Sequence, residues 1–299
     1  MRSFSQLLRS WFPPLFPARR VGWLCSISQV ETQDFLNAFI QGLHDNTVQI
    51  NPQYFANGDY EQGNIATLTG HATQLMLAGV NVIVATGGVA SLQAAVQAAN
   101  NNPSIRIPIL YIVGLDLNNA SVQHANISGG INLDIPSYDA QRAATLRAAP
   151  YNATNVGLLA NLNAAMGPKE QGNWTQGNFG PVEARGNGET NAHIPLAQAI
   201  QNVIQNGADG IVVSGDPYFT SQRHSLVPLL NNTHLPVSYP FDIYRSVNPH
   251  PTLGRSMRFG PDLIAEYTNL GDKARQVLSC SAAIPQVGVR QAPNAPVPW

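Results

Sequence analysis

The chain has 299 residues, a formal net charge of −1 and only 11% charged residues. This length suffices for one large or two modest α/β domains with a buried core. The near-neutral charge excludes the basic surface typical of nucleic-acid-binding proteins. No apolar run in the sequence approaches the roughly 18 residues of a membrane-spanning helix.

The N-terminal segment has a positive start and some apolar character, but Pro13, Pro14 and Pro17 interrupt it. Proline lacks a backbone N–H and breaks the apolar helix that a secretory signal requires. No small-residue cleavage site follows a clear apolar run. We therefore place residues 1–19 outside the fold, as a leader or a disordered segment.

From Arg20 onward, short apolar runs alternate with amphipathic segments such as the one in which Phe35, Phe39 and Leu43 recur at helical spacing. This alternation is typical of a parallel sheet with helices on both faces. The first half predicts strands at 20–27, 48–55, 81–86 and 107–114, and helices at 32–45, 64–79 and 89–100.

The same pattern begins again in the second half of the chain. A stretch rich in Gly, Asn and Gln, residues 166–191, interrupts it and is expected to form loops around one short strand at 180–186. The second half predicts further strands at 155–161, 209–214 and 235–241, and helices at 141–149, 194–207 and 220–233.

The two halves contain matching stretches, "VIVATGGVASLQ" and "IVVSGDPYFTSQ". Each combines a buried strand, a sharp glycine turn and a helix. Open α/β sheets bind ligands at the carboxyl ends of their strands. We therefore expect the turns Thr86–Gly88 and Gly215–Pro217 to face each other across one ligand-binding cleft.

Three motifs resemble a known family when taken together. They are Gly215–Phe219 in "VSGDPYFTSQRHSLVPLLNNTHLPVSYPF", Phe259–Leu263 in "GRSMRFGPDLIAEYTNLGDKARQVL", and the block "GDYEQGNIATLTGHATQLMLAGVNVIVATGG". The chain resembles the substrate-binding components of bacterial ABC importers that have the type I periplasmic-binding-protein fold. The branch it resembles includes tryptophan- and tyrosine-type binding proteins.

The resemblance implies two doubly wound parallel-sheet lobes joined by hinge strands, an α/β fold. The first lobe is expected to comprise 20–131 and 253–299, and the second 132–252. Hinge strands are expected at "GGINLDI" and around "LGRSMRFGPD". The resemblance also implies a periplasmic, monomeric protein that captures a small polar ligand without a cofactor and meets a membrane permease.

The two turns carry the main candidate ligand contacts. Backbone N–H groups at a helix N-terminus suit an anion, and glycine permits close approach, so Thr86, Gly87 and Gly88 are predicted to hold a carboxylate or phosphate. Their alternative role is a plain tight turn. Asp216 either binds a ligand ammonium or hydroxyl, or caps the helix that Pro217 begins. The two turns together favour an amino acid or a close relative.

Other polar or aromatic side chains near predicted strand ends are further ligand-binding candidates. Ser26 and Ser28 have an alternative role in helix capping, and Tyr218 has one in packing. They are Ser26, Ser28, Asp116, Asn163, Tyr218 and Tyr239.

The sequence contains no HExxH or GxSxG motif and no carboxylate pair in an acid/base context. Cys25 and Cys280 have no metal-ligand spacing and are expected to be packing residues. We therefore expect neither catalysis nor a metal. Three alternatives stay open: an α/β enzyme acting on a sugar- or nucleotide-like substrate, the effector domain of a regulator, and a degraded copy that no longer binds a ligand.

Overall fold

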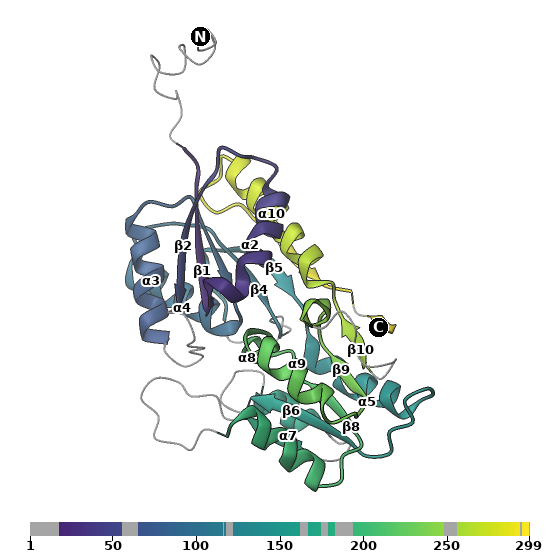
Figure 1. Ribbon diagram of the computed structural model, residues 1–299. Helices are drawn as coiled ribbons and strands as arrows, with labels where there is room; N and C mark the ends of the chain where they lie inside the picture. Colours follow the sequence, from purple (N-terminus) through teal and green to yellow (C-terminus); the bar gives the residue numbers. More distant parts are fainter. Residues whose placement is uncertain are drawn as a thin grey trace, which may run out of the picture.

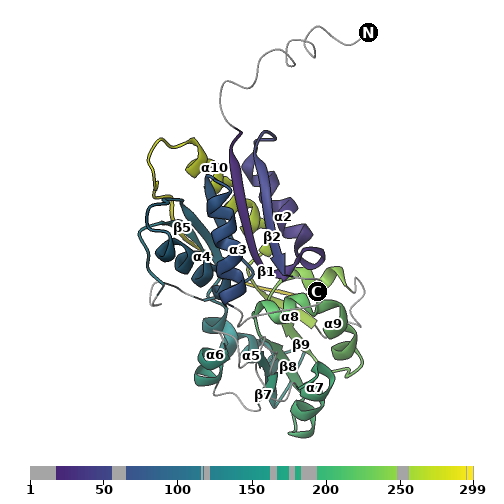
Figure 2. The same cartoon turned by 90° about the vertical axis from the view of Figure 1, so that its left-hand side faces the viewer.

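The computed structural model describes residues 18–55, 65–115, 117, 122–161, 167–174, 179–182, 194–247, 256–293 and 295–298. These residues form two α/β lobes, each built on a sheet of six described strands. The first lobe lies above the second in Figures 1 and 2. The predicted fold class, two doubly wound lobes, is confirmed.

The first sheet is parallel throughout, in the order β11-β5-β4-β3-β1-β2. Side chains alternate along a strand, so each buried strand contributes to two cores. Trp23 therefore packs on one face of the sheet and Leu24 on the other. The strands are β1 (Arg20–Ser28), β2 (Gln49–Phe55), β3 (Val82–Thr86), β4 (Ile109–Val113), β5 (Ile127–Asn132) and β11 (Gly288–Gln291).

Helices cover both faces of this sheet (Figure 1). Helices α2 (Gln29–Leu43) and α10 (Leu263–Ser279) pack together on the face of Trp23. Helices α3 (Ile65–Leu77) and α4 (Val89–Asn101) pack together on the face of Leu24.

Two glycines allow the backbones of α2 and α10 to meet. A Cβ added at Gly42 would lie 1.9 Å from the Thr268 carbonyl oxygen, and one added at Gly271 would lie 2.1 Å from the Phe39 carbonyl oxygen. No side chain fits at such distances. This glycine contact joins a helix from the start of the chain to one near its end.

The second sheet has the order β12-β10-β9-β8-β6-β7, with β12 antiparallel to β10 and the other pairs parallel. Its strands are β6 (Val156–Asn161), β7 (Phe179–Val182), β8 (Gly210–Val213), β9 (Val237–Tyr239), β10 (Ser256–Gly260) and β12 (Ala295–Pro298).

Helix α5 (Asp139–Arg147) packs on one face of the second sheet, and α7 (Leu196–Gln205) and α9 (Arg223–Asn231) pack on the other. The shorter elements of this lobe are α6 (Gly167–Asn173), α8 (Pro217–Ser221) and the 3₁₀ helices η2 (Ile135–Tyr138) and η3 (Asp242–Ser246).

The described chain crosses between the lobes three times: from β5 to η2, from β10 to α10, and from β11 to β12. The first two crossings coincide with the predicted hinge stretches. The lobe boundaries differ from those predicted, since 253–299 was assigned to the first lobe whereas β10 and β12 pair within the second sheet. Strand periodicity does not reveal which of two sheets a strand joins.

Other predictions also need correction. Residues 167–173 form helix α6 within the stretch predicted as loops, and the helix predicted at 220–233 divides into the end of α8 and α9. Cys25 is buried, as expected for a packing residue, but Cys280 is exposed at the end of α10. None of the helices in the described ranges has the length and apolar character needed to cross a membrane.

Candidate functional site

A small cavity lies where the carboxyl ends of strands from both sheets meet. Its volume is about 40 Å³, room for roughly three water molecules at about 10–15 Å³ each. The described residues that line it are mainly apolar and come from both lobes. They include Ile27, Phe35, Gly87, Gly88, Ile112, Leu133, Gly215, Pro217, Thr220, Phe241, Leu263 and Tyr267.

Gly87 and Gly88 form the first-lobe wall of the cavity. Strand β3 ends at Thr86, and both glycines then take positive φ, 78° and 109°, where other residues are strained. Gly88 is the N-cap of α4, and no side chain caps this helix end. Backbone N–H groups of the first turn of α4 therefore begin at the cavity wall.

Ser26 holds this glycine turn from the neighbouring strand. Its hydroxyl donates a hydrogen bond to the Gly87 carbonyl, and the side chain is fully buried. Thr86 is also fully buried, and its hydroxyl lies 3.4 Å from the Leu24 carbonyl oxygen. Both side chains therefore lie behind the turn, and the glycines form the wall itself.

The turn Gly215–Pro217 forms the facing wall from the second lobe. Asp216 in its centre is fully buried and caps α8: its Oδ1 accepts from the Tyr218 backbone N–H at 2.9 Å. The same oxygen accepts from Asn161 Nδ2 at 3.2 Å, which ties the end of β6 to the turn. The capping role of Asp216 is thus present in this structure.

A buried acidic group lies behind the second-lobe turn. Glu170 Oε1 accepts from the Ser214 hydroxyl at 2.6 Å, and Ser214 Oγ accepts from the Asp216 backbone N–H at 3.0 Å. Burial raises the pKa of Glu170 well above its usual range, with the Asp139 carboxylate adding to the effect. Burial also raises the pKa of Asp139 to about 6, against the opposing effect of Arg142.

Sequence reasoning missed this group. Glu170 falls in the stretch expected to be loops, and Asp139 and Arg142 lie at the start of a helix with no distinguishing motif. A pair of ionisable residues three apart on a short helix is a common surface pattern, so no local signal indicated burial.

Aromatic side chains from α2 and α10 form another wall of the cavity. The rings of Phe35 and Tyr267 stack with centroids 4.7 Å apart at an angle of 8°. Phe35 was predicted to lie on the packing face of a helix, but its position beside the cavity was not. The two residues lie on helices from opposite ends of the chain.

The other predicted residues that the structure describes, Ser28, Tyr218 and Tyr239, are not among the lining residues. Ser28 is nearly buried, and its carbonyl accepts from the Thr32 hydroxyl at 2.9 Å. Tyr218 packs edge-on against Phe219, and burial raises its pKa to about 12. Tyr239 is fully buried and stacks on Tyr244 at 5.0 Å. Asp116 and Asn163 lie outside the described residues.

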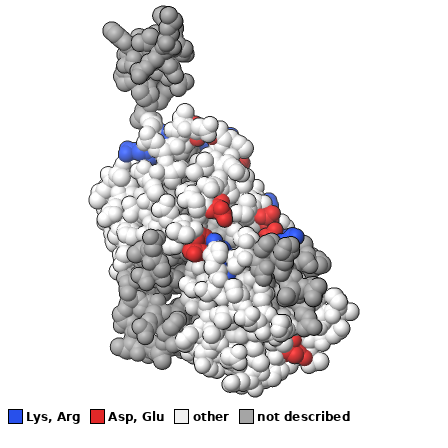
Figure 3. Space-filling model, viewed as in Figure 1, with Lys and Arg blue, Asp and Glu red and all other residues white. Residues whose placement is uncertain are grey.

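The surface shown in Figure 3 has few charged side chains, and those of both signs are interspersed. Among the described atoms of this face, Lys and Arg do not gather into an extended basic patch. The sparse charge agrees with the 11% charged residues of the sequence.

No protein-family model matches the sequence, and no curated protein matches it. Solved structures share its fold. A conserved domain protein from Vibrio cholerae is 16% identical with a TM-score of 0.69, over 94% of this chain and 92% of that one. An ABC domain from Streptococcus pneumoniae in complex with L-Trp is 16% identical with a TM-score of 0.66, over 92% and 90%.

An ABC transporter solute-binding protein from Bacillus halodurans with bound myo-inositol is 10% identical, with a TM-score of 0.64 over 96% of each chain. Likeness at these identities concerns the fold. The fold is that of the type I periplasmic binding proteins, as the sequence predicts.

Proposed function

We propose that this protein is the solute-binding component of a bacterial ABC importer and captures a small polar or amphipathic molecule between its lobes. The observation that carries the proposal is the cavity at which strand ends of both sheets meet, with one glycine turn from each lobe in its wall. Ligands of open α/β folds bind at such strand ends. Localisation outside the cytoplasm, action as a monomer and delivery to a membrane permease belong to the same proposal.

The chemistry of the walls favours an amino acid as the ligand. The amides of Gly87 and Gly88, with the N-terminus of α4 behind them, suit a carboxylate. Asp216, in the centre of the facing turn, suits an ammonium group. The stacked rings of Phe35 and Tyr267 provide an apolar wall for a side chain. One protein of the same fold holds L-Trp, which supports this choice.

Binding would proceed by hinge closure. A cavity of about 40 Å³ is far smaller than the roughly 300–1,000 Å³ of typical ligand sites, so a ligand of amino-acid size requires the lobes to separate. The three crossing segments are the natural hinges. Contacts from both lobes to one ligand then favour the closed state over the open one.

Isothermal titration calorimetry with the proteinogenic L-amino acids, myo-inositol and common hexoses tests this function. We expect heat with at least one amino acid and a marked loss of affinity for it in Asp216→Asn. Asp34→Asn, an exposed carboxylate on α2, is the matched control and should bind as the wild type does. Absence of heat with every amino acid, or unchanged binding by Asp216→Asn, would contradict the amino-acid assignment.

An enzyme on the same fold is the second candidate. The buried pair of Glu170 and Asp139 favours it, because raised carboxylate pKa values often accompany acid/base chemistry. Against it, both carboxylates are buried, and neither is among the described residues that line the cavity. Turnover of a sugar or nucleotide panel would establish the enzyme. Lack of both heat and turnover would favour a degraded, non-binding copy.

A further inference from the structure

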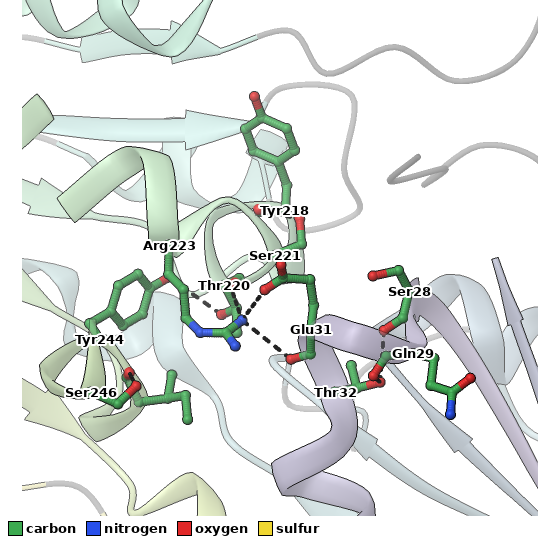
Figure 4. Close-up of polar contacts among 11 residues, drawn as sticks. Ser28, Gln29, Glu31, Thr32, Tyr218, Thr220, Ser221, Arg223, Tyr244 and Ser246 are labelled. Atoms are coloured by element: carbon green, nitrogen blue, oxygen red, sulfur yellow. Dashed lines mark hydrogen bonds and ion pairs between the residues drawn. The ribbon is translucent and has the colours of Figure 1, made fainter. Parts of the chain in front are cut away.

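An ion pair joins the two lobes beside the cavity. Arg223, the first residue of α9 in the second lobe, places Nη1 2.5 Å from Oε2 of Glu31, in the first turn of α2 in the first lobe. The same nitrogen lies 3.2 Å from the Glu31 carbonyl oxygen. Figure 4 shows Arg223 reaching across to the end of α2.

The second lobe holds this guanidinium in place. Arg223 Nη1 also donates to the Thr220 carbonyl at 2.9 Å, so the side chain folds back over the end of α8. The Arg223 side chain is 6% exposed and that of Glu31 is 22% exposed. A charge-assisted hydrogen bond this poorly solvated is stronger than an ion pair on an open surface.

The pair sits on the elements that carry the two cavity walls. Helix α2 follows directly after β1, and its Phe35 lines the cavity one turn beyond Glu31. Helix α8 begins at Pro217 of the second-lobe turn and ends just before Arg223, and its Thr220 lines the cavity. The ion pair thus connects the two walls without lining the cavity.

We propose that Glu31 and Arg223 form an interlobe latch that stabilises the closed arrangement. Each partner belongs to a different lobe, so the pair exists when the lobes meet and is lost when they separate. An interaction made in one state alone shifts the equilibrium toward that state. The latch rests on the hinge closure of the proposed function, but not on the amino-acid ligand.

The latch also predicts a dependence on salt. Glu31 is partly exposed, so added salt screens its charge more than it would in a buried pair. The ligand-free wild-type protein should therefore open further as ionic strength rises. A variant that lacks the Glu31 charge should lose most of this response.

Pulsed electron paramagnetic resonance on the full-length, ligand-free chain measures the interlobe distance directly. One spin label is attached to the exposed Cys280 of the first lobe, and the other to Gln201→Cys on the exposed side of α7 in the second lobe. Cys25 is fully buried and should not react. The distance distribution reports closed and open molecules without any ligand.

We compare Glu31→Gln, Arg223→Gln and the double variant with the wild type, using Asp34→Asn as a control of equal charge change on the same helix. Each single variant should lower the closed-to-open ratio by about tenfold, the effect of removing roughly 1.4 kcal/mol. The double variant should be no more open than the singles, because both lose the same contact. Asp34→Asn should match the wild type.

Distance distributions of Glu31→Gln that equal those of the wild type would overturn the latch. Glu31 is partly exposed, so this variant keeps the test valid if Arg223→Gln fails to fold, which circular dichroism detects. The result is independent of the calorimetry: a shifted distance with no amino-acid heat retains the latch and removes the amino-acid function. Heat with an amino acid but an unshifted interlobe distance in Glu31→Gln retains the amino-acid function and removes the latch.

Discussion

Arg142 Nη1 lies 3.0 Å from Asp139 Oδ1 in the interior of the second lobe, and the guanidinium is fully buried. Its Nη2 donates to the carbonyl oxygens of Val213 and Ser238, each at 2.6 Å. One side chain of α5 thereby joins β8 to the neighbouring strand β9. Strand β8 leads directly to the second-lobe turn Gly215–Pro217.

Replacing Arg142 with Met should destabilise the second lobe by about 3–5 kcal/mol, because the variant leaves a buried carboxylate without its cation. Urea denaturation followed by circular dichroism measures the loss. Arg142→Met combined with Asp139→Asn should recover part of it. Arg245→Met, an exposed arginine on η3, should change stability by less than about 0.5 kcal/mol. A small effect at Arg142 would show that the ion pair is unimportant.

Glu170→Gln should become increasingly stabilising relative to the wild type as pH rises. Burial raises the pKa of Glu170 and moves that of Asp139 from 3.8 to about 6, so the folded chain holds these protons more tightly than the unfolded chain. The free energy of unfolding therefore falls as pH rises from the usual carboxyl pKa of about 4 through the raised pKa values, that of Asp139 being about 6. Glutamine keeps an acceptor for the Ser214 hydroxyl but cannot ionise.

Urea denaturation midpoints of the wild type and Glu170→Gln, measured from about pH 4 to above pH 6, give the difference in their stability at each pH. Comparing variant and wild type cancels Asp45, Asp209 and Asp272, whose lowered pKa values act in the opposite direction in both. Asp34→Asn serves as the surface control, and its difference from the wild type should be nearly independent of pH. A constant difference for Glu170→Gln would refute the raised pKa.

Gly42→Ala should destabilise the first lobe by about 1–3 kcal/mol or more, because the methyl group meets the α10 backbone and forces the helices apart. Gly70→Ala in α3 is the matched control. A Cβ at Gly70 has nothing within 4 Å, so alanine there should stabilise the helix by about 0.5–1 kcal/mol. Thermal unfolding compares the two, and equal effects would contradict the close contact.

Ser26→Ala should weaken amino-acid binding about tenfold while lowering stability by only about 1 kcal/mol, the usual value of one hydrogen bond. The hydroxyl holds the Gly87 carbonyl and so orients the amides of the turn. Calorimetry gives the affinity and urea denaturation the stability. Ser279→Ala loses a comparable bond to the Gln276 carbonyl on the surface and should leave binding unchanged.

The two thiols should differ sharply in reactivity. Cys25 is buried in β1, where burial raises the pKa of its thiol and disfavours the reactive thiolate, whereas Cys280 is exposed. Native protein should therefore react with Ellman's reagent at Cys280 alone, and urea should release the second thiol. Rapid reaction of both thiols in the native state would be inconsistent with a buried Cys25.

The elements that the sequence predicted well are those whose signal is local. Strand β3 is a continuous apolar run ended by two glycines, and helix α4 follows with its own periodicity, so neighbouring residues alone indicate both. The repeat of this pattern in the second half indicated two lobes with facing turns. Those turns indeed line one cavity.

Contacts between distant segments decided the rest. Phe35 and Tyr267 form one wall although more than two hundred residues separate them, and Glu31 meets Arg223 only because two lobes lie side by side. The burial of Glu170 likewise depends on tertiary packing, and so does the pairing of β10 and β12 within the second sheet. Periodicity records which face of an element is apolar, but the tertiary fold selects the partner that covers it, because many partners satisfy the same apolar pattern.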